Sequence, residues 1–85
     1  THHYDLKSKF INAIYEDQSG EIWIGTSTAG LNKYDRRTKE FRAYVHDPFD
    51  PQSISADNVL SIYQDREGTL WLGTAGGGLN RKQSR

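Results

Sequence analysis

The chain has 85 residues, and its 11 basic and 11 acidic side chains give a formal net charge of zero. This length allows one small domain at most, while 34% hydrophobic and 12% aromatic residues are too many for a disordered chain. Zero charge argues against nucleic-acid binding, the absence of Cys excludes a disulfide scaffold or a thiolate zinc site, and no apolar stretch is long enough to span a membrane. The sequence also lacks Met, so we expect a processed chain or an excerpt from a longer protein.

Residues 11–16 are predicted to form the first strand, because they are rich in β-branched and aromatic side chains and show no helical period. A turn is expected next, in which Asp17 accepts backbone N–H groups and Gly20 adopts the positive φ that closes a bulged hairpin. Residues 21–26 then form a second strand, whose Ile-Trp-Ile centre predicts that both faces of the sheet are covered.

A third and a fourth strand complete this unit. Residues 30–35 follow a loop of small residues, and a polar turn at 36–39 leads into 40–45, which is typical of a half-exposed strand. Residues 46–57 contain two prolines, which cannot join a ladder, and are predicted to connect this unit to the next.

The second half of the chain repeats the first without a gap, in a constant register that places Asp65 over Asp17. Strands are therefore expected at 58–64, 69–74 and 78–82. A period in the forties indicates an array of small supersecondary units. The repeated pairs, which we interpret as a structural motif, are Asp17 and Asp65, Gly20 and Gly68, Trp23 and Trp71, Gly25 and Gly73, Thr26 and Thr74, Gly30 and Gly78, Leu31 and Leu79, and Asn32 and Asn80.

Four short antiparallel strands in each unit predict an all-β fold of β-propeller blades, with about two blades in the chain. Residues 11–45 would form a complete blade and 58–85 the first three strands of another. Residues 1–6 would supply the remaining outer strand, so that one blade is split across the termini of a single two-blade segment. The N-terminal strand of a neighbouring copy could close such a blade and remove its exposed edge.

The motif resembles the two-component regulator propeller repeat, both in the residue pairs above and in the connection at 47–55. The resemblance implies a fragment of the sensor region of hybrid two-component histidine kinases. This region is periplasmic in the family and often responds to carbohydrates.

The repeated polar and aromatic residues have structural explanations beside the functional ones. Asp17 and Asp65 could act as paired carboxylates in acid–base chemistry, but their repeated position favours turn capping. Trp23 and Trp71 could stack on sugars or bases, but their apolar neighbours favour packing between blades.

The remaining candidates are weaker. The Gly76–Gly78 run resembles a phosphate loop but lacks the Lys and Ser or Thr that should follow, and it opens a strand. His2 and His3 lack carboxylate support for a metal, and Thr1 lacks an oriented base. Three acidic residues could bind calcium, but their spacing fits no calcium loop; they are Asp47, Asp50 and Asp57. We therefore expect no enzymatic activity, no metal and no cofactor.

With no catalytic, metal or cofactor site expected, we expect the function of the chain to be self-assembly. Two blades alone would expose two apolar faces, so the expected partner is the chain itself, in a cyclic homo-oligomer that is a trimer or a tetramer. The alternative is a sensor fragment that binds a small ligand, such as an oligosaccharide, through loops at one end. Those loops lack an aromatic platform, and their candidate residues are Ser27, Thr28, Asn58, Ala75 and Gly76.

Overall fold

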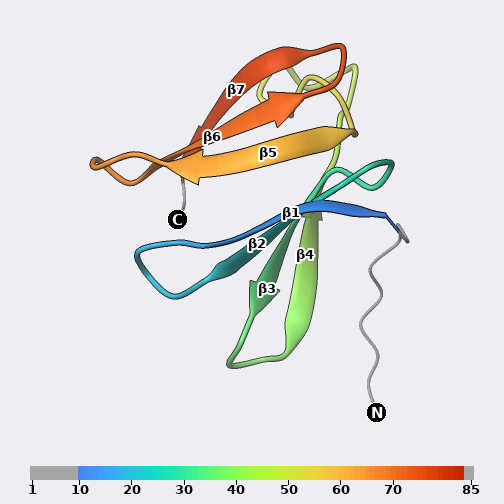
Figure 1. The fold of residues 1–85 in the computed structure, drawn as a ribbon. Coiled ribbons are helices and arrows are strands. Elements are labelled where there is room, and N and C mark those ends of the chain that lie inside the picture. Colours follow the sequence, from blue (N-terminus) through green and yellow to red (C-terminus); the bar gives the residue numbers. More distant parts are fainter. Residues whose placement is uncertain (1–9, 84–85) are drawn as a thin grey trace.

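The computed structural model describes residues 10–83, which form two antiparallel sheets and no helix (Figure 1). Sheet 1 has four strands, in the order β1 (Ile11–Glu16), β2 (Ile22–Thr26), β3 (Leu31–Asp35) and β4 (Glu40–Tyr44). Sheet 2 has three strands, in the order β5 (Val59–Gln64), β6 (Thr69–Thr74) and β7 (Gly78–Gln83). The predicted all-β fold of small antiparallel blades is confirmed. Residues 1–6, to which a further outer strand was assigned from the sequence, lie outside the described residues.

Glycine closes the first hairpin of each sheet. Gly20 and Gly68 both have a φ of 88°, in the left-handed region that a residue with a Cβ rarely adopts. The amide of Gly20 donates to the carbonyl of Asp17 at 3.0 Å, and Gly68 repeats this bond to Asp65 at 3.1 Å. The same local sequence therefore gives the same turn twice.

A β-bulge occurs at the same place in both repeats. The β1–β2 register shifts around Asn12, and the β5–β6 register shifts around Leu60, its equivalent in the second repeat. Bulges re-aim side chains. In β1 the result is that Asn12 reaches the other sheet, where its Nδ2 donates to the carbonyl of Val59 at 2.9 Å.

The two sheets pack face to face along β1, β2 and β5 (Figure 1). Sheet 1 contributes Trp23 and Leu31 to their shared core. Sheet 2 contributes Val59, Leu70 and Leu72, and the connection contributes Ile54. Burying large apolar side chains between two sheets is what joins them into one body.

Candidate functional site

A buried carboxylate holds the β1–β2 turn. Asp17 Oδ1 accepts the backbone N–H groups of Ser19 and Glu21, each at 2.9 Å. Asp17 Oδ2 accepts the indole Nε1–H of Trp23 at 2.7 Å. Both carboxylate oxygens are therefore engaged within the fold, and the bond to the indole orients the largest side chain of the core.

The β5–β6 turn repeats this arrangement. Asp65 Oδ1 accepts the backbone N–H groups of Glu67 and Thr69 at 2.9 and 3.0 Å, and Oδ2 accepts the indole N–H of Trp71 at 2.9 Å. The hydrogen bond from Trp71, together with the backbone bonds, holds the pKa of Asp65 below its ordinary value of 3.8. Sequence reasoning missed the bond between Asp and Trp, although their identical spacing in both repeats was the signal for it.

The repeated threonines close the next loop. Thr26 Oγ1 donates to the carbonyl of Gly30 at 2.8 Å and accepts the amide of Ala29 at 2.9 Å. Thr74 Oγ1 donates to the carbonyl of Gly78 at 2.8 Å. These hydroxyls bond to the backbone of the fold.

The repeated asparagines bond to different partners. Asn32 Nδ2 donates to the carbonyl of Ala29 at 3.3 Å. Asn80 instead ties sheet 2 to the connection, because its Oδ1 accepts the amide of Ser55 at 3.1 Å and its Nδ2 donates to Ser55 Oγ at 2.7 Å.

The candidate ligand-facing residues belong to the β2–β3 loop, the β6–β7 loop and the segment before β5, which lie at the end of the molecule opposite the β1–β2 and β5–β6 turns (Figure 1). Ser27 Oγ donates to Asn12 Oδ1 at 3.4 Å, and Asn12 Nδ2 donates to Asn58 Oδ1 at 3.0 Å. The amide of Ala75 donates to the carbonyl of Asn58 at 2.9 Å. Thr28 and Gly76 are exposed there. Several of the polar groups at this end thus bond to one another.

A polar seam borders the core at the Asp turns. The backbone N–H of Gln18 donates to Gln64 Oε1 at 2.7 Å, and Gln18 Nε2 donates to the carbonyl of Asp65 at 3.2 Å. Gln18 comes from sheet 1 and the other two residues from sheet 2. These bonds set how the two sheets align.

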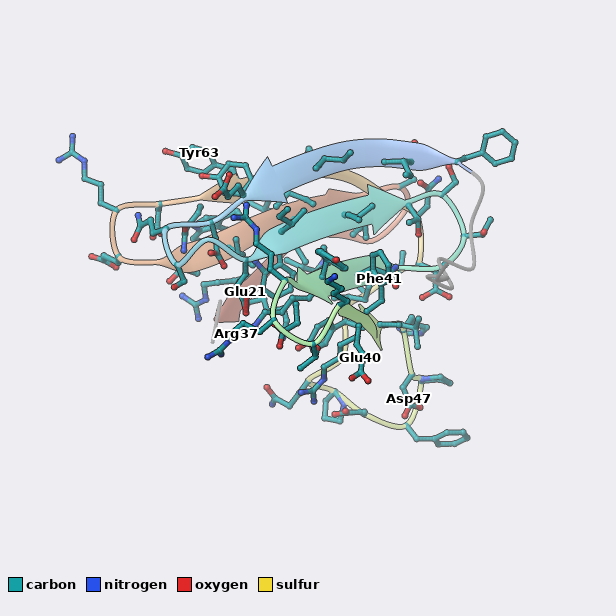
Figure 2. All side chains as sticks on the ribbon, turned by 90° about the horizontal axis from the view of Figure 1, so that it is seen from below. Glu21, Arg37, Glu40, Phe41, Asp47 and Tyr63 are labelled. Atoms are coloured by element: carbon teal, nitrogen blue, oxygen red, sulfur yellow. The ribbon has the colours of Figure 1, made fainter. Side chains whose placement is uncertain are left out.

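Each sheet has one face packed in the core and one open face that no other part of the described chain covers. The motif residues that sheet 1 buries in the core have their equivalents on the open face of sheet 2. Trp23 is buried, whereas Trp71 is half-buried. Tyr15 packs against the core, whereas Tyr63 is 61% exposed and lies at the periphery of the molecule (Figure 2). The open face of sheet 2 therefore presents the same apolar surface that sheet 1 uses inside the molecule.

The open face of sheet 1 mirrors the buried face of sheet 2 in the same way. Ile62 packs against the core, but its equivalent Ile14 is 66% exposed. Ile14 pairs with Ile24 across the β1–β2 ladder, so the two side chains share this face. The two open faces of the molecule thus correspond to the two faces that meet inside it.

A groove of about 780 Å³ runs beside β7 and the end of β4; Tyr44, Asp50, Asn80, Arg81 and Lys82 are among the residues that line it. None of the five candidate ligand-facing residues lines this groove. Lys82 Nζ lies 3.9 Å from the centre of the Tyr44 ring, and burial, followed by the charges of two nearby basic residues, lowers the pKa of Lys82.

The groove lies along the outer edge of sheet 2, beside β7. In sheet 1, the equivalent edge carries the fourth strand, β4. A side chain at Gly30 would collide with the carbonyl of Tyr44 and with Val45, whereas a Cβ at Gly78 would meet no atom within 4 Å. Among the described residues, no strand pairs with β7 on its outer edge. Within residues 10–83, sheet 2 therefore has an unpaired edge at β7, where sheet 1 has β4.

Residues 10–83 show neither a metal-binding cluster nor a membrane-spanning helix. No three His, Cys, Asp or Glu side chains there are grouped as metal ligands. The described segment holds no helix able to cross a membrane.

The model of the two component regulator propeller family matches residues 5–28 and 53–76. The chain belongs to this family. The two matched ranges follow the register of the repeat, so that residue 6 is equivalent to Ile54 of the connection. Comparison with curated proteins gives no significant match.

Solved structures support the same assignment. The extracellular domain of the hybrid two component system BT3049 from B. thetaiotaomicron is 30% identical, with a TM-score of 0.81 over 93% of this chain. The extracellular domain of the one component system BT4673 from B. thetaiotaomicron is 29% identical, with a TM-score of 0.76 over 85% of this chain. The chain covers only 12% and 10% of those structures, so it resembles a small segment of such extracellular domains.

Proposed function

We propose that the chain is a two-blade module of a β-propeller, whose activity is to associate through its two open sheet faces until the ring of blades closes. The observation that carries this proposal is the exposure of Leu79, Tyr63 and Ile14 on the outer faces, where their equivalents are packed between the sheets. Leaving apolar surface in water costs about 25 cal/mol per Å², so covering both faces favours a ring.

In this proposal the module belongs to the setting of its structural neighbours, the extracellular sensor region of two-component regulators. Its role there is architectural: it supplies two blades and holds its neighbours in register. The Asp–Trp bonds of the turns support this role, because they engage the repeated carboxylates within the fold.

For the 85-residue chain, the proposed partner is a second copy, in a cyclic trimer or tetramer. The interface is head to tail, since the two open faces differ from each other. The free edge of β7 would gain a strand from the neighbour as the ring closes, which pairs the exposed backbone groups along this edge of sheet 2.

Light scattering coupled to size exclusion, over a range of protein concentrations, tests the proposal. A mass three or four times that of one chain, together with a strand-type circular dichroism signal, is the expected result. A folded monomer at all concentrations would overturn self-assembly. A parallel thermal-shift screen with oligosaccharides tests the alternative, because a ligand that binds the folded state raises the melting temperature.

A further inference from the structure

The polar seam between the two sheets of one chain shows which residues would meet if a second copy packed against the chain in the same way. There, Gln18 of sheet 1 meets Gln64 of sheet 2, through a bond of 2.7 Å from the backbone N–H of Gln18 to Gln64 Oε1. Both side chains are uncharged, so this internal contact is indifferent to salt.

Exchanging each residue of this neutral pair for its equivalent in the other repeat gives a charged pair. The equivalent of Gln18 on sheet 2 is Arg66, and the equivalent of Gln64 on sheet 1 is Glu16. Both are exposed in the single chain. When the open face of sheet 2 meets the open face of sheet 1 with the internal geometry, these opposite charges are placed together.

Glu16 can pair with Arg66 of another copy while it keeps its ion pair with Arg36. Its Oε2 lies 3.1 Å from Arg36 Nη2, in a pair whose side chains are both more than half exposed. A carboxylate offers two oxygens and about four lone-pair sites, so it accepts from two arginines at once. Arg66 presents both a backbone N–H and a guanidinium where Gln18 presents a backbone N–H and an amide.

A polar contact between the two sheets at the opposite end of the molecule changes in a compatible way. Asn12 Nδ2 donates to Asn58 Oδ1 at 3.0 Å inside the molecule. The equivalent residues are Leu60 and Phe10, which are 50% and 69% exposed. An amide pair is thus replaced by two apolar side chains, and both sides of the contact change together.

We propose that a second copy of the chain docks on the open face of sheet 2 through the open face of its sheet 1, and that an ion pair between Arg66 of one copy and Glu16 of the next sets the direction of this joint. This inference rests on the proposed function and adds to it the contact that makes the joint sensitive to charge. A joint between two sheet 2 faces would hold Arg66 from both copies and no Glu16, and a joint between two sheet 1 faces would hold Glu16 and no Arg66. Neither joint could form the ion pair, so the pair favours the head-to-tail direction.

The test compares three variants with the parent chain, by measuring the association constant from the dilution dependence of light scattering at low and at high salt. Arg66→Glu places two carboxylates at the joint. Arg37→Glu, in the β3–β4 turn, makes the same change in net charge and serves as the control (Figure 2). The double variant with Arg66→Gln and Glu16→Gln recreates the neutral pair of the internal seam.

Arg66→Glu is expected to weaken association by roughly tenfold at low salt, and by less at high salt. Arg37→Glu should leave it within about twofold of the parent, as is usual for surface charges away from a contact. The double variant should associate with little salt dependence. Association of the parent with no difference between Arg66→Glu and Arg37→Glu would overturn the ion pair and leave the proposed function standing. A parent chain that stays monomeric would overturn both.

Discussion

Leu31 and Leu79 are equivalent residues in the two repeats, yet Leu31 is 0% exposed and Leu79 is 69% exposed. Each lies in the third strand of a repeat and pairs across its ladder with a glycine, Gly25 or Gly73. The difference arises because sheet 2 covers the face that carries Leu31, whereas the face that carries Leu79 is the outer surface of the molecule.

This difference in burial predicts that truncation to alanine affects a different property at each position. Leu31→Ala should lower the free energy of unfolding by about 2–5 kcal/mol, because it opens a cavity in the core between the sheets. Leu79→Ala should change the stability of the monomer by less than about 1 kcal/mol and weaken association instead. Urea unfolding of dilute protein, together with light scattering at high concentration, separates the two effects. Equal losses of monomer stability would contradict the assignment of Leu79 to an outer face.

The paired glycines provide a second prediction. A Cβ at Gly25 would lie 2.8 Å from Val59 Cγ1 across the core, so Gly25→Ala should destabilise the chain by about 1–3 kcal/mol through overpacking. At Gly73 the nearest atom is the hydroxyl of Ser61, at 2.5 Å, on an exposed side chain that can move aside. Thermal unfolding of the two alanine variants should therefore show the larger loss for Gly25→Ala.

The buried turn carboxylate predicts a third effect. Asp17→Asn replaces one of the two acceptor oxygens by an NH2 group that cannot accept, and it leaves either the Trp23 indole or the turn amides without a partner. The expected loss is about 1–3 kcal/mol of unfolding free energy. Asp50→Asn is the matched control, because the carboxylate of Asp50 caps an exposed turn through the amide of Gln52. A similar loss for both variants would argue against the special role of the buried turn.

Acid stability tests the bond between Asp65 and Trp71. Since the Trp71 hydrogen bond lowers the pKa of Asp65 in the folded chain below 3.8, its contribution to stability is complete above that value and is lost as the pH falls through the folded pKa. Between about pH 4 and pH 2, the parent should therefore lose more stability than Asp65→Asn. Guanidinium unfolding at fixed pH values measures the difference. Parallel pH curves for the two proteins would refute the contribution of this carboxylate.

The repeat made much of the fold predictable. The Asp and Gly of each turn and the β-branched residues of each strand act locally, so their effect is the same wherever the unit occurs. The structure accordingly has strands at Ile22–Thr26 and Thr69–Thr74, close to the predicted 21–26 and 69–74. The spacing between Asp17 and Trp23 was also in the sequence, but only the packed indole revealed its hydrogen bond.

The roles of equivalent residues could not be read from the sequence in this way. Trp23 and Trp71 have the same immediate neighbours in kind, and local pattern gives them the same expected environment. Only the packing of β1 and β2 against β5 distinguishes them, because burial depends on which sheet lies opposite. The amino-acid sequence by itself thus determined the blade and its repetition, through turn chemistry and strand propensity. The tertiary structure decided which face of each blade is core and which is open, because one pair of faces meets inside the chain and leaves the equivalent pair outside.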